Sequence, residues 1–376
     1  MRPLQMVDTK TQYNKIKTEV DAAVIAVLES SQFIGGKVVA DFATHLADYN
    51  GVKHAIPCAN GTDALQIAMM ALDLQPGDEV ITPSFTYIAT VEAAAILKLK
   101  PVFVEVDKQT FCIDPEAIEK AITPKTKAIV PVHLYGHAAD MEKIMAIAAK
   151  HNLHVIEDNA QAIGCNYTFS DGSVKKTGGI AHIGTTSFYP SKNLGAYGDG
   201  GAMFTNDDML SEKLKKIAAH GQGARYYHDI VGCNSRLDAV QAAILDIKLQ
   251  HLDEYILARR KAADFYDKAF ANHTKITTPF RAAYNDHVFH QYTLVLNGVD
   301  RDALSAFLAE QKIPSMIYYP VPCHKQKMFE SFGGSSYDLP VTDWLTERVI
   351  SLPIHTELDE EQQSYIVKNV LGFANR

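Results

Sequence analysis

The sequence has few cysteines, and none of them lies in a pattern that marks a metal site or a disulfide framework. Its five cysteines are scattered singly over 376 residues, with no C-x-x-C pair and no histidine at metal-ligand spacing. We therefore expect no bound metal, and we expect a reduced protein of the cytoplasm.

Long apolar runs are also missing. No stretch approaches the roughly 20 apolar residues of a membrane span, and the first ten residues lack the apolar run of a signal peptide. The 36 basic and 44 acidic residues give a formal net charge of −8, and the short basic groups lie in helix-like stretches as solvated faces. Because nucleic-acid binding needs a concentrated basic surface, we expect neither a membrane nor a nucleic acid as partner.

Three common catalytic motifs are absent. The sequence contains no G-x-G-x-x-G after a strand, no G-x-x-x-x-G-K-[ST] and no H-E-x-x-H. These motifs build dinucleotide-binding, P-loop and zinc-peptidase sites, so the sequence predicts none of the three. A glycine cluster from Gly195 to Gly201 does not have the spacing of a phosphate fingerprint. It indicates a turn that joins two strands.

Apolar runs rich in Val and Ile alternate with helix-like segments from Gly51 to about Asn206. The expected strands are Glu79–Thr82, Pro101–Val106, Ala128–Val132, His154–Glu157 and Thr185–Phe188. The expected helices are Thr62–Asp73, Tyr87–Lys98 and Asp140–His151, preceded by two amphipathic helices at Tyr13–Glu29 and Val38–Tyr49. This alternation predicts an α/β domain with a large, mainly parallel sheet between layers of helices.

A second, smaller unit follows. One long helix is predicted over Leu237–Phe270, then a strand at Gln291–Leu296 and helices at Asp300–Gln311 and Asp359–Val370. A chain of this length exceeds one compact core, so we divide it into a large domain, residues 1–245, and a small α+β domain, residues 246–376, that includes the linking helix. No low-complexity linker separates them, which predicts tight contact.

Two segments of the large domain could bind a phosphate and a ring. The segment Cys58–Leu65 runs from a strand through Gly61 into a helix beginning near Thr62, which points backbone N–H groups at a phosphate. An ordinary helix cap is the alternative. Glu157 and Asp158 form an acidic pair at the end of a strand, where one of the two carboxylates could pair with a protonated ring nitrogen. Capping of the next helix is the alternative there.

A third segment places Lys192 after a strand, inside a polar turn rich in glycine. A lysine in a closed pocket can form a Schiff base and then carry a proton, because desolvation lowers its pKa. A single lysine is more often a surface charge. The occurrence of all three segments, in order, in one α/β domain favours the catalytic interpretation.

With these pieces the sequence resembles the DegT/DnrJ/EryC1/StrS family of sugar aminotransferases, which have the aspartate-aminotransferase-like fold of pyridoxal-phosphate enzymes (fold type I). The resemblance covers about residues 5 to 370. Its most specific segments are Ala59–Leu65, Pro83–Tyr87, Glu157–Gln161, Ser187–Lys192 with Gly198–Gly201, and Gly232–Arg236.

The resemblance implies a set of roles around pyridoxal 5'-phosphate. Lys192 would hold the cofactor covalently and Asp158 would pair with its ring nitrogen, while Gln161 would bind the phenolic oxygen and Phe85 would stack on the ring. The phosphate would be held by Gly61, Thr62 and Ser187, joined by Asn234 from a second subunit. Each active site of a homodimer would then contain residues from both subunits. Packing, strand-end and turn-forming roles are the alternatives for Phe85, Ser187 and Asn234.

The reaction implied by the resemblance is transfer of an amino group from glutamate to a nucleotide-linked 3-keto sugar, for amino-sugar biosynthesis in a polysaccharide such as lipopolysaccharide. The branch most similar to this chain aminates UDP-2-acetamido-2-deoxy-3-oxo-glucuronate, and there Arg236 would meet the sugar carboxylate. Tyr318 stands where that branch has histidine. His324 matches relatives that act on dTDP-3-keto-6-deoxyhexoses, so both are candidate sugar-site residues.

Three alternatives remain at this point. The first is amination of a dTDP-3-keto-6-deoxyhexose. The second is dehydration, which Lys192 disfavours because the deoxygenating branch has histidine there. The third, of a different class, is a non-catalytic regulatory dimer that keeps the fold.

Overall fold

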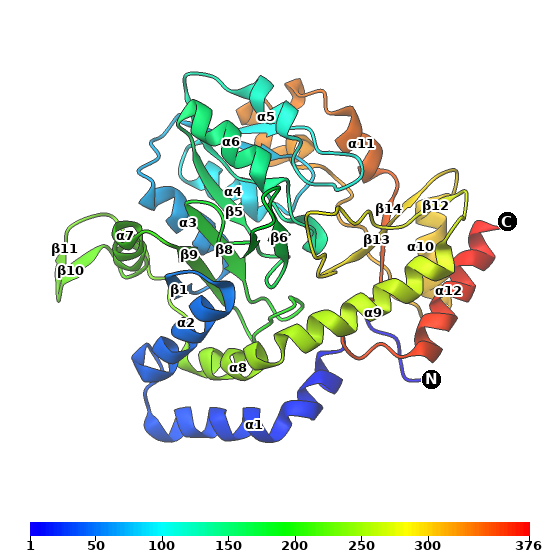
Figure 1. The fold of residues 1–376 in the computed structure, drawn as a ribbon, viewed down its shortest axis with the longest axis horizontal. Coiled ribbons are helices and arrows are strands. Elements are labelled where there is room, and N and C mark those ends of the chain that lie inside the picture. Colours follow the sequence, from blue (N-terminus) through cyan, green and yellow to red (C-terminus); the bar gives the residue numbers. More distant parts are fainter.

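The structure, a computed structural model, describes residues 1–376, and seven of its strands form one central sheet (Figure 1). In chain order these strands are β1 (His54–Cys58), β2 (Glu79–Pro83), β3 (Lys100–Val104), β4 (Thr126–Ile129), β5 (His154–Asp158), β8 (Ile183–Ser187) and β9 (Gly201–Thr205). Their spatial order is β1-β9-β8-β5-β4-β2-β3. Only β9 runs against the others, because it pairs antiparallel with both β1 and β8.

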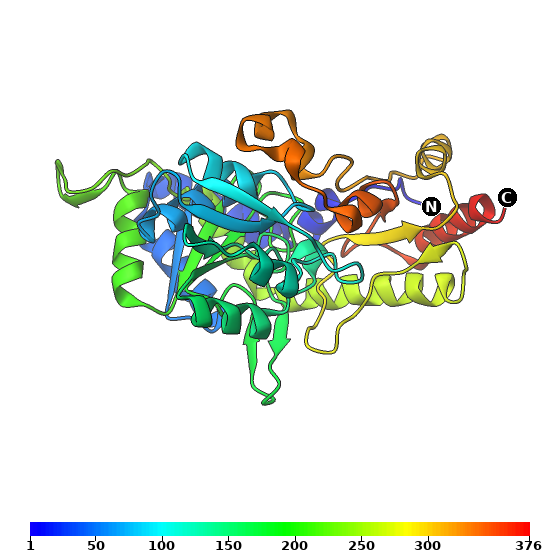
Figure 2. The ribbon, with the colours of Figure 1, turned by 90° about the horizontal axis from the view of Figure 1, so that it is seen from above.

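Helices cover both faces of this sheet (Figures 1 and 2). They are α2 (Gly36–Asn50), α3 (Gly61–Ala71), α4 (Ala89–Ile96), α5 (Pro115–Ala121), α6 (Met141–His151) and α7 (Asp208–Ala218). Consecutive strand residues serve opposite faces, so that Val80 and Ile156 belong to one core while Ile81 and Val155 belong to the other. Burial on both faces explains why these strands are continuous apolar runs.

Two hairpins project from this domain. The first is formed by β6 (Asn166–Thr168) and β7 (Val174–Lys176), and the second by β10 (Gln222–Ala224) and β11 (Tyr227–His228). The second stands clear of the body in both views (Figures 1 and 2). Tyr226 and Tyr227 at its tip are 79% and 72% exposed.

The long helix predicted over Leu237–Phe270 is two helices, α8 (Ala239–Gln250) and α9 (Leu252–Phe270). The prediction of one helix was therefore wrong at His251, whose backbone (φ −99°, ψ 0°) interrupts the hydrogen-bond ladder for one turn. The two halves pack on different partners. Ile244 of α8 shares a small core with Ile16 and Val20 of α1 (Thr9–Ser30), whereas α9 enters the second core.

That second core belongs to a small antiparallel sheet of β12 (Ile276–Thr277), β13 (Tyr292–Leu296) and β14 (Val349–Leu352). The helices around it are α10 (Arg301–Glu310), α11 (Pro340–Thr346) and α12 (Glu360–Ala374). Its 18 buried residues begin at Ala262 within α9. Val288 and Val349 pack in the large core instead, so the two units are in tight contact.

Each of the other predicted helices and strands is present, and its observed ends lie within four residues of the predicted ones. The division at residue 245 stays a prediction. The first residues of the chain pack on the second unit, because Arg2 donates a hydrogen bond to the Glu357 carbonyl at 2.5 Å. None of the helices combines the length and the apolarity that crossing a bilayer requires.

Candidate active site

Four strands bring the predicted site together at one edge of the sheet. β1, β2, β5 and β8 run in the same direction, so the residues that follow their carboxyl ends lie at a common edge. The strand register places Cys58 and Ser187 on either side of Gly201, and Asp158 beside Thr185. Four segments widely separated in the sequence thereby meet within a few strand spacings.

Asp158 is a buried carboxylate, 5% exposed. Thr90 at the start of α4 donates its hydroxyl hydrogen bond to Oδ2 at 2.8 Å, and the backbone N–H of Ala160 donates to Oδ1 at 3.2 Å. Both hydrogen-bond donors are neutral, and no cationic side chain contacts this carboxylate. A protonated ring nitrogen placed beside this carboxylate would be stabilised in its charged form.

Lys192 lies in a turn that is held by hydrogen bonds to several parts of the chain. Its own N–H donates to the Tyr189 carbonyl at 2.8 Å, and Asn193 donates to the Val288 carbonyl at 3.0 Å. The buried Lys248 of α8 donates to the carbonyl of Gly195. A Cβ at Gly195 would lie 2.5 Å from the Pro190 carbonyl oxygen, so the turn requires glycine.

Burial lowers the pKa of Lys192 to about 8, and the negative charge of Asp158 opposes that decrease. A lysine with this pKa is uncharged in about one molecule in ten at pH 7, several hundred times more often than a lysine with the ordinary pKa of 10.5. The uncharged amine is the form that attacks an aldehyde, and it can afterwards accept and return a proton.

The N-terminus of α3 approaches the end of β8 closely. A Cβ on Gly61 would lie 2.8 Å from the Ser187 Cβ, and one on Gly201 would lie 2.5 Å from the Asn60 carbonyl carbon. Asn60 caps the helix by accepting from the Asp63 N–H at 2.8 Å. The N–H groups of Gly61 and Thr62, in the first turn, have no partner within the helix and can bind an anion.

Aromatic side chains surround Gln161. Its Oε1 accepts from the Tyr135 N–H at 2.8 Å, and its Nε2 donates to the Tyr319 hydroxyl at 3.1 Å. Phe85 is 0% exposed and has Tyr135 and Tyr319 edge-on at 6.4 and 6.3 Å between ring centroids. The aromatic with an open face is Tyr87, which is 56% exposed.

The predicted sugar-site residues lie in different environments. Tyr318 is partly exposed, and its carbonyl accepts from the Tyr135 hydroxyl, which ties the small unit to the large one. His324 is only 2% exposed; its Nδ1 is 2.7 Å from the Ser84 hydroxyl and its Nε2 is 3.8 Å from Asp343. In this structure His324 presents no surface to a ligand.

Asn234 and Arg236 share one face of an extended segment between β11 and α8. Both are exposed, whereas Ser235 and Leu237, which alternate with them, are buried. The Ser235 hydroxyl accepts from the Ala59 N–H at 3.0 Å, directly before the α3 turn. The inward side chains hold the segment next to the site, and Asn234 and Arg236 point away from the body of their own chain.

Two neighbours of the predicted site have no signal in the sequence. Thr90 lies 68 positions before Asp158, and no local motif marks it. His290 is 5% exposed and its Nδ1 has no hydrogen-bond partner; burial holds its pKa well below the usual range, and the Lys192 charge adds to that effect. Only the fold brings these side chains to Asp158 and Lys192.

A buried carboxylate beside a lysine of lowered pKa, next to a glycine-bordered helix N-terminus, fits pyridoxal phosphate by its three recognition points: ring nitrogen, aldehyde and phosphate. The fold and the site thus define a pyridoxal-phosphate-dependent aminotransferase of the aspartate-aminotransferase-like class. The chain belongs to the DegT/DnrJ/EryC1/StrS aminotransferase family, whose model matches residues 14–371. The family and fold predicted from the sequence are confirmed.

Similar proteins agree with this placement. The chain is 47% identical to a pleiotropic regulatory protein of Geobacillus stearothermophilus (98% of each chain covered) and 46% identical to the UDP-2-acetamido-2-deoxy-3-oxo-D-glucuronate aminotransferase of Pseudomonas aeruginosa (95% and 96%). It is 45% identical to a UDP-N-acetyl-3-dehydro-alpha-D-glucosamine 3-aminotransferase of Acidithiobacillus ferrooxidans (96% and 95%). The crystal structure of S. venezuelae DesV with a ketimine intermediate superposes with a TM-score of 0.94 at 38% identity, covering both chains fully.

The lowered pKa of Lys192 predicts how the cofactor-free chain takes up pyridoxal phosphate. Only the uncharged amine reacts, so the uptake rate should rise roughly tenfold per pH unit from pH 6 and level off near the pKa of about 8. Stopped-flow absorbance of the bound cofactor measures this rate. A rate still rising toward pH 10.5, the usual lysine value, would contradict the desolvated environment.

Proposed function

We propose that this chain transfers an amino group from glutamate to C3 of UDP-2-acetamido-2-deoxy-3-oxo-glucuronate, in the cytoplasm, as a step in making a polysaccharide amino sugar. The observation that carries the reaction is the Lys192 amine, with a pKa of about 8, within electrostatic reach of the buried Asp158. The sugar is supported by the P. aeruginosa relative and by the exposed guanidinium of Arg236, which suits a carboxylate.

Each residue of the site has a distinct task in this proposal. When bound, pyridoxal phosphate supplies an electron sink for the charge left by a broken C–H bond. Asp158 holds the ring nitrogen protonated, and Lys192 moves the proton at the reacting carbon. Gly61, Thr62 and Ser187 bind the phosphate.

The ring is held from its edge and from its face. Gln161 has one amide hydrogen beyond its bond to Tyr319, and it donates this hydrogen to the phenolic oxygen. We assign the aromatic contact on the ring face to Tyr87 rather than to the enclosed Phe85, because Tyr87 has the open face. His324 positions Ser84 instead of touching sugar, and Tyr318 stays a candidate sugar contact.

Two other functions keep some support. Relatives named for dTDP-sugar transamination, at 37% to 42% identity, favour a dTDP-3-keto-6-deoxyhexose as the second candidate substrate. The similarity to a protein named as a pleiotropic regulator supports a regulatory role. A purely regulatory chain has no need of a lysine with lowered pKa next to a buried carboxylate, so catalysis is the better-supported function.

A substrate panel tests the assignment. The enzyme is incubated with glutamate and, separately, with the UDP-3-keto uronate, its UDP-3-keto-N-acetylglucosamine counterpart and a dTDP-3-keto-6-deoxyhexose, and the product mass is read. We expect the uronate to react with the largest kcat/KM. A dTDP sugar that reacts while the uronate does not would overturn the substrate, and no amino product from glutamate with any of the three sugars would overturn the proposed transamination.

The same panel tests Arg236. The variant Arg236→Gln loses a charge-assisted hydrogen bond, so kcat/KM for the uronate should fall about 10- to 100-fold. The sugar without a carboxylate serves as the matched control and should be unaffected. Equal losses on both sugars would assign Arg236 to the nucleotide or to the assembly rather than to the carboxylate.

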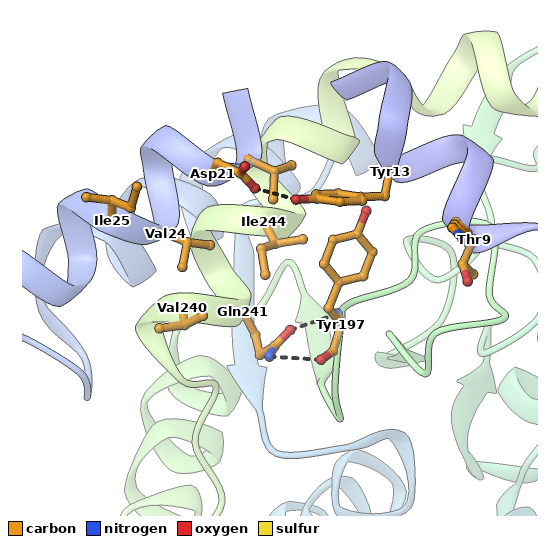
Figure 3. A pocket seen from close by; sticks show the side chains of 11 residues that line it. Thr9, Tyr13, Asp21, Val24, Ile25, Tyr197, Val240, Gln241 and Ile244 are labelled. Carbon is orange, nitrogen blue, oxygen red and sulfur yellow. Dashed lines mark hydrogen bonds between the residues drawn. The ribbon is translucent and has the colours of Figure 1, made fainter. Parts of the chain in front are cut away.

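We further propose that two chains form a dimer with shared sites, in which Asn234 reaches the phosphate of the partner's cofactor. Its side chain faces away from its own chain, as described above. The segment of Asn234 leads into α8, and a mainly apolar groove of about 590 Å³ between α1 and α8 is bordered by Tyr13, Val24, Tyr197 and Ile244 (Figure 3). Apolar side chains about half exposed continue this surface at Ile25, Leu28, Phe33 and Ile34.

Mixing two inactive variants tests the shared site. Lys192→Ala removes the amine, and Asn234→Asp places a negative charge against the phosphate. In a mixed dimer one site keeps both residues intact, so random mixing after subunit exchange should restore about a quarter of wild-type activity. No recovery, with mixed dimers verified by mass, would show that Asn234 serves its own chain or none.

A further inference from the structure

A carboxylate that no step above uses lies directly beside Asp158. Glu157 is 0% exposed, and its side chain points to the opposite side of β5 from that of Asp158, as neighbouring strand residues do. A buried carboxylate is expensive to keep unless it is fully hydrogen-bonded. Its position next to the proposed ring-nitrogen partner calls for a physical explanation.

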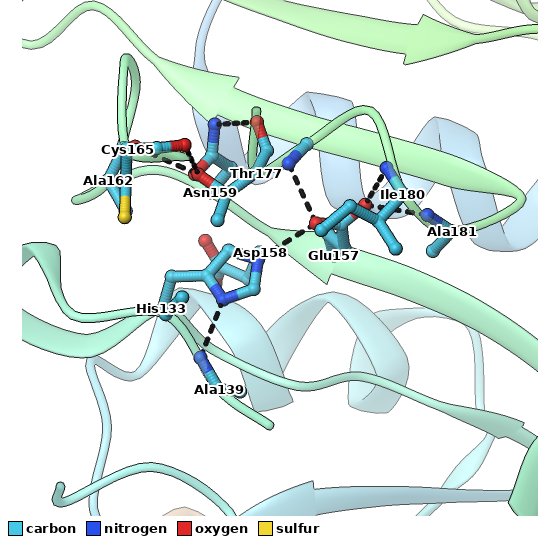
Figure 4. Close-up of polar contacts among 12 residues, drawn as sticks. His133, Ala139, Glu157, Asp158, Asn159, Ala162, Cys165, Thr177, Ile180 and Ala181 are labelled. Atoms are coloured by element: carbon cyan, nitrogen blue, oxygen red, sulfur yellow. Dashed lines mark hydrogen bonds and ion pairs between the residues drawn. The ribbon is translucent and has the colours of Figure 1, made fainter. Parts of the chain in front are cut away.

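Four N–H groups satisfy the Glu157 carboxylate (Figure 4). Oε1 accepts from the backbone of Ile180 at 2.8 Å and of Ala181 at 2.7 Å. Oε2 accepts from the backbone of Gly178 at 2.7 Å and lies 2.9 Å from Nε2 of His133. The carboxylate therefore connects the loop before β8 to the segment after β4.

The hydrogen bonds define which nitrogen of His133 carries the proton. The Ala139 N–H donates to Nδ1 at 3.1 Å, so Nδ1 is an acceptor and Nε2 must be the donor to Glu157. The imidazole is 0% exposed and in contact on both nitrogens. His133 thus has one orientation and one tautomer available to it.

The backbone of His133 in turn holds Asp158. Its N–H donates to the Asp158 carbonyl at 3.1 Å, and the Asp158 N–H donates to the Pro131 carbonyl at 2.9 Å. These bonds extend the β4–β5 pairing to the end of β5, where Val132 and Asp158 form an isolated bridge. The hydrogen bonds to Pro131 and His133 thus fix the Asp158 backbone to one segment. The bond between the His133 side chain and Glu157 holds that segment in place.

Glu157 also acts on the strand that leads to Lys192. Residues 178–181, which donate three of its four hydrogen bonds, run directly into β8, and β8 ends at Ser187 before the lysine turn. Asn159 adds a parallel tie, because its N–H donates to the Thr185 carbonyl at 2.8 Å. One carboxylate therefore joins the two strands that carry Asp158 and Lys192.

We propose that Glu157 and His133 are positioning residues that hold the Asp158 carboxylate in register with the cofactor's ring nitrogen and with Lys192. This inference rests on the proposed role of Asp158. Neither residue touches cofactor or substrate. Their effect is to fix Asp158 and Lys192 relative to each other, so that one bound cofactor can have its ring nitrogen at Asp158 and its reacting carbon at Lys192.

The decisive variants are Glu157→Gln and a pair at His133. In Glu157→Gln an amide NH₂ group replaces one carboxylate oxygen. This hydrogen-bond donor then faces other donors, either the N–H groups of Gly178 and His133 or those of residues 180 and 181. His133 cannot change tautomer to accommodate it, because its Nδ1 accepts from Ala139. His133→Gln retains an N–H donor near the Nε2 position, whereas His133→Leu removes it.

Three readouts separate positioning from plain stabilisation: kcat against KM, the pH titration of the bound cofactor's visible absorbance, and the melting temperature. We expect kcat to fall roughly 10- to 100-fold in Glu157→Gln and His133→Leu with little change in KM. The absorbance titration should shift by about one pH unit. His133→Gln should restore most of both properties, and a Glu157→Gln/His133→Leu double variant should be no worse than either alone.

Gln363→Leu is the matched control, since it removes a buried hydrogen bond of 2.9 Å to the Ala262 carbonyl in the small domain. It should lower the melting temperature without shifting the titration. Variants at 157 and 133 that behave like this control overturn the positioning role while leaving the proposed function standing. Wild-type protein without any cofactor absorbance would instead overturn the proposed function. If Glu157→Gln does not fold, the comparison of His133→Gln with His133→Leu decides.

Discussion

Lys192→Ala is expected to lower kcat by roughly 100- to 10,000-fold, the range typical for loss of a positioned proton-transfer group, and to abolish covalent attachment of the cofactor. The expectation follows from the position of the Lys192 amine, which is partly exposed to a ligand, lies within reach of the Asp158 charge and has its pKa lowered to about 8 by burial. Reduction with borohydride followed by peptide mass mapping shows which lysine carries the cofactor. In wild-type protein the label should be found on residue 192 alone.

Lys248 makes this a discriminating experiment. Burial also lowers its pKa to about 8, but it is 1% exposed and its ammonium donates to the Gly195 carbonyl. A lowered pKa without an open approach does not make a nucleophile. Lys248→Met should therefore keep the label on Lys192, with at most a reduced rate from a loosened turn. A label on Lys248, or activity near wild type in Lys192→Ala, would remove the basis of the mechanism. A small primary amine added to Lys192→Ala should restore part of the activity.

Asp158→Asn is expected to lower kcat by about 100- to 1,000-fold, because it removes the charge that keeps the ring nitrogen protonated while preserving the shape of the side chain. The amide oxygen can still accept from the Ala160 N–H at the Oδ1 position, and the amide NH₂ at the Oδ2 position can donate to the Thr90 hydroxyl once that hydroxyl turns, so folding should be little affected. The Asp158 charge raises the pKa of Lys192, so its removal should move the pH midpoint of cofactor uptake below the wild-type value of about 8.

Thr90→Val is the matched comparison for Asp158→Asn. It removes only the 2.8 Å hydrogen bond to the carboxylate and leaves the charge in place. We expect a loss of about tenfold, consistent with one hydrogen bond to a charged group. Equal losses in the two variants would mean that the orientation of Asp158, rather than its charge, limits the rate. If the pH midpoint of cofactor uptake were unchanged in Asp158→Asn, the charge of Asp158 would have no electrostatic effect on Lys192.

The part of the site carried by continuous segments could be predicted from the sequence. A strand, a glycine turn and a helix in order place Gly61 and Thr62, and a strand followed by a polar turn places Lys192. These patterns are local, because backbone geometry over ten residues determines them. Their joint occurrence in family order supplied the cofactor as well.

Partners from distant segments could not be predicted in this way. Thr90, His133 and Tyr319 contact site residues from other parts of the chain, and no spacing rule connects them to Asp158 or Gln161. The sequence predicted Phe85 as the aromatic that stacks on the ring; the structure adds that Phe85 is fully buried whereas Tyr87 is 56% exposed, a difference that depends on what else packs there. The same holds for His324, which Ser84 and Phe103 enclose.

By itself the sequence determined the alternation of strands and helices, the family and its cofactor, and it predicted which residues bind the pyridine ring, the aldehyde and the phosphate. The tertiary structure alone decided that Lys192 is desolvated beside Asp158, that the long helix breaks at His251, and that Glu157 links the two strands carrying the site. The physical reason is that a pKa, an exposed face and a buried hydrogen bond are set by neighbours in space, which the order of residues along the chain does not specify.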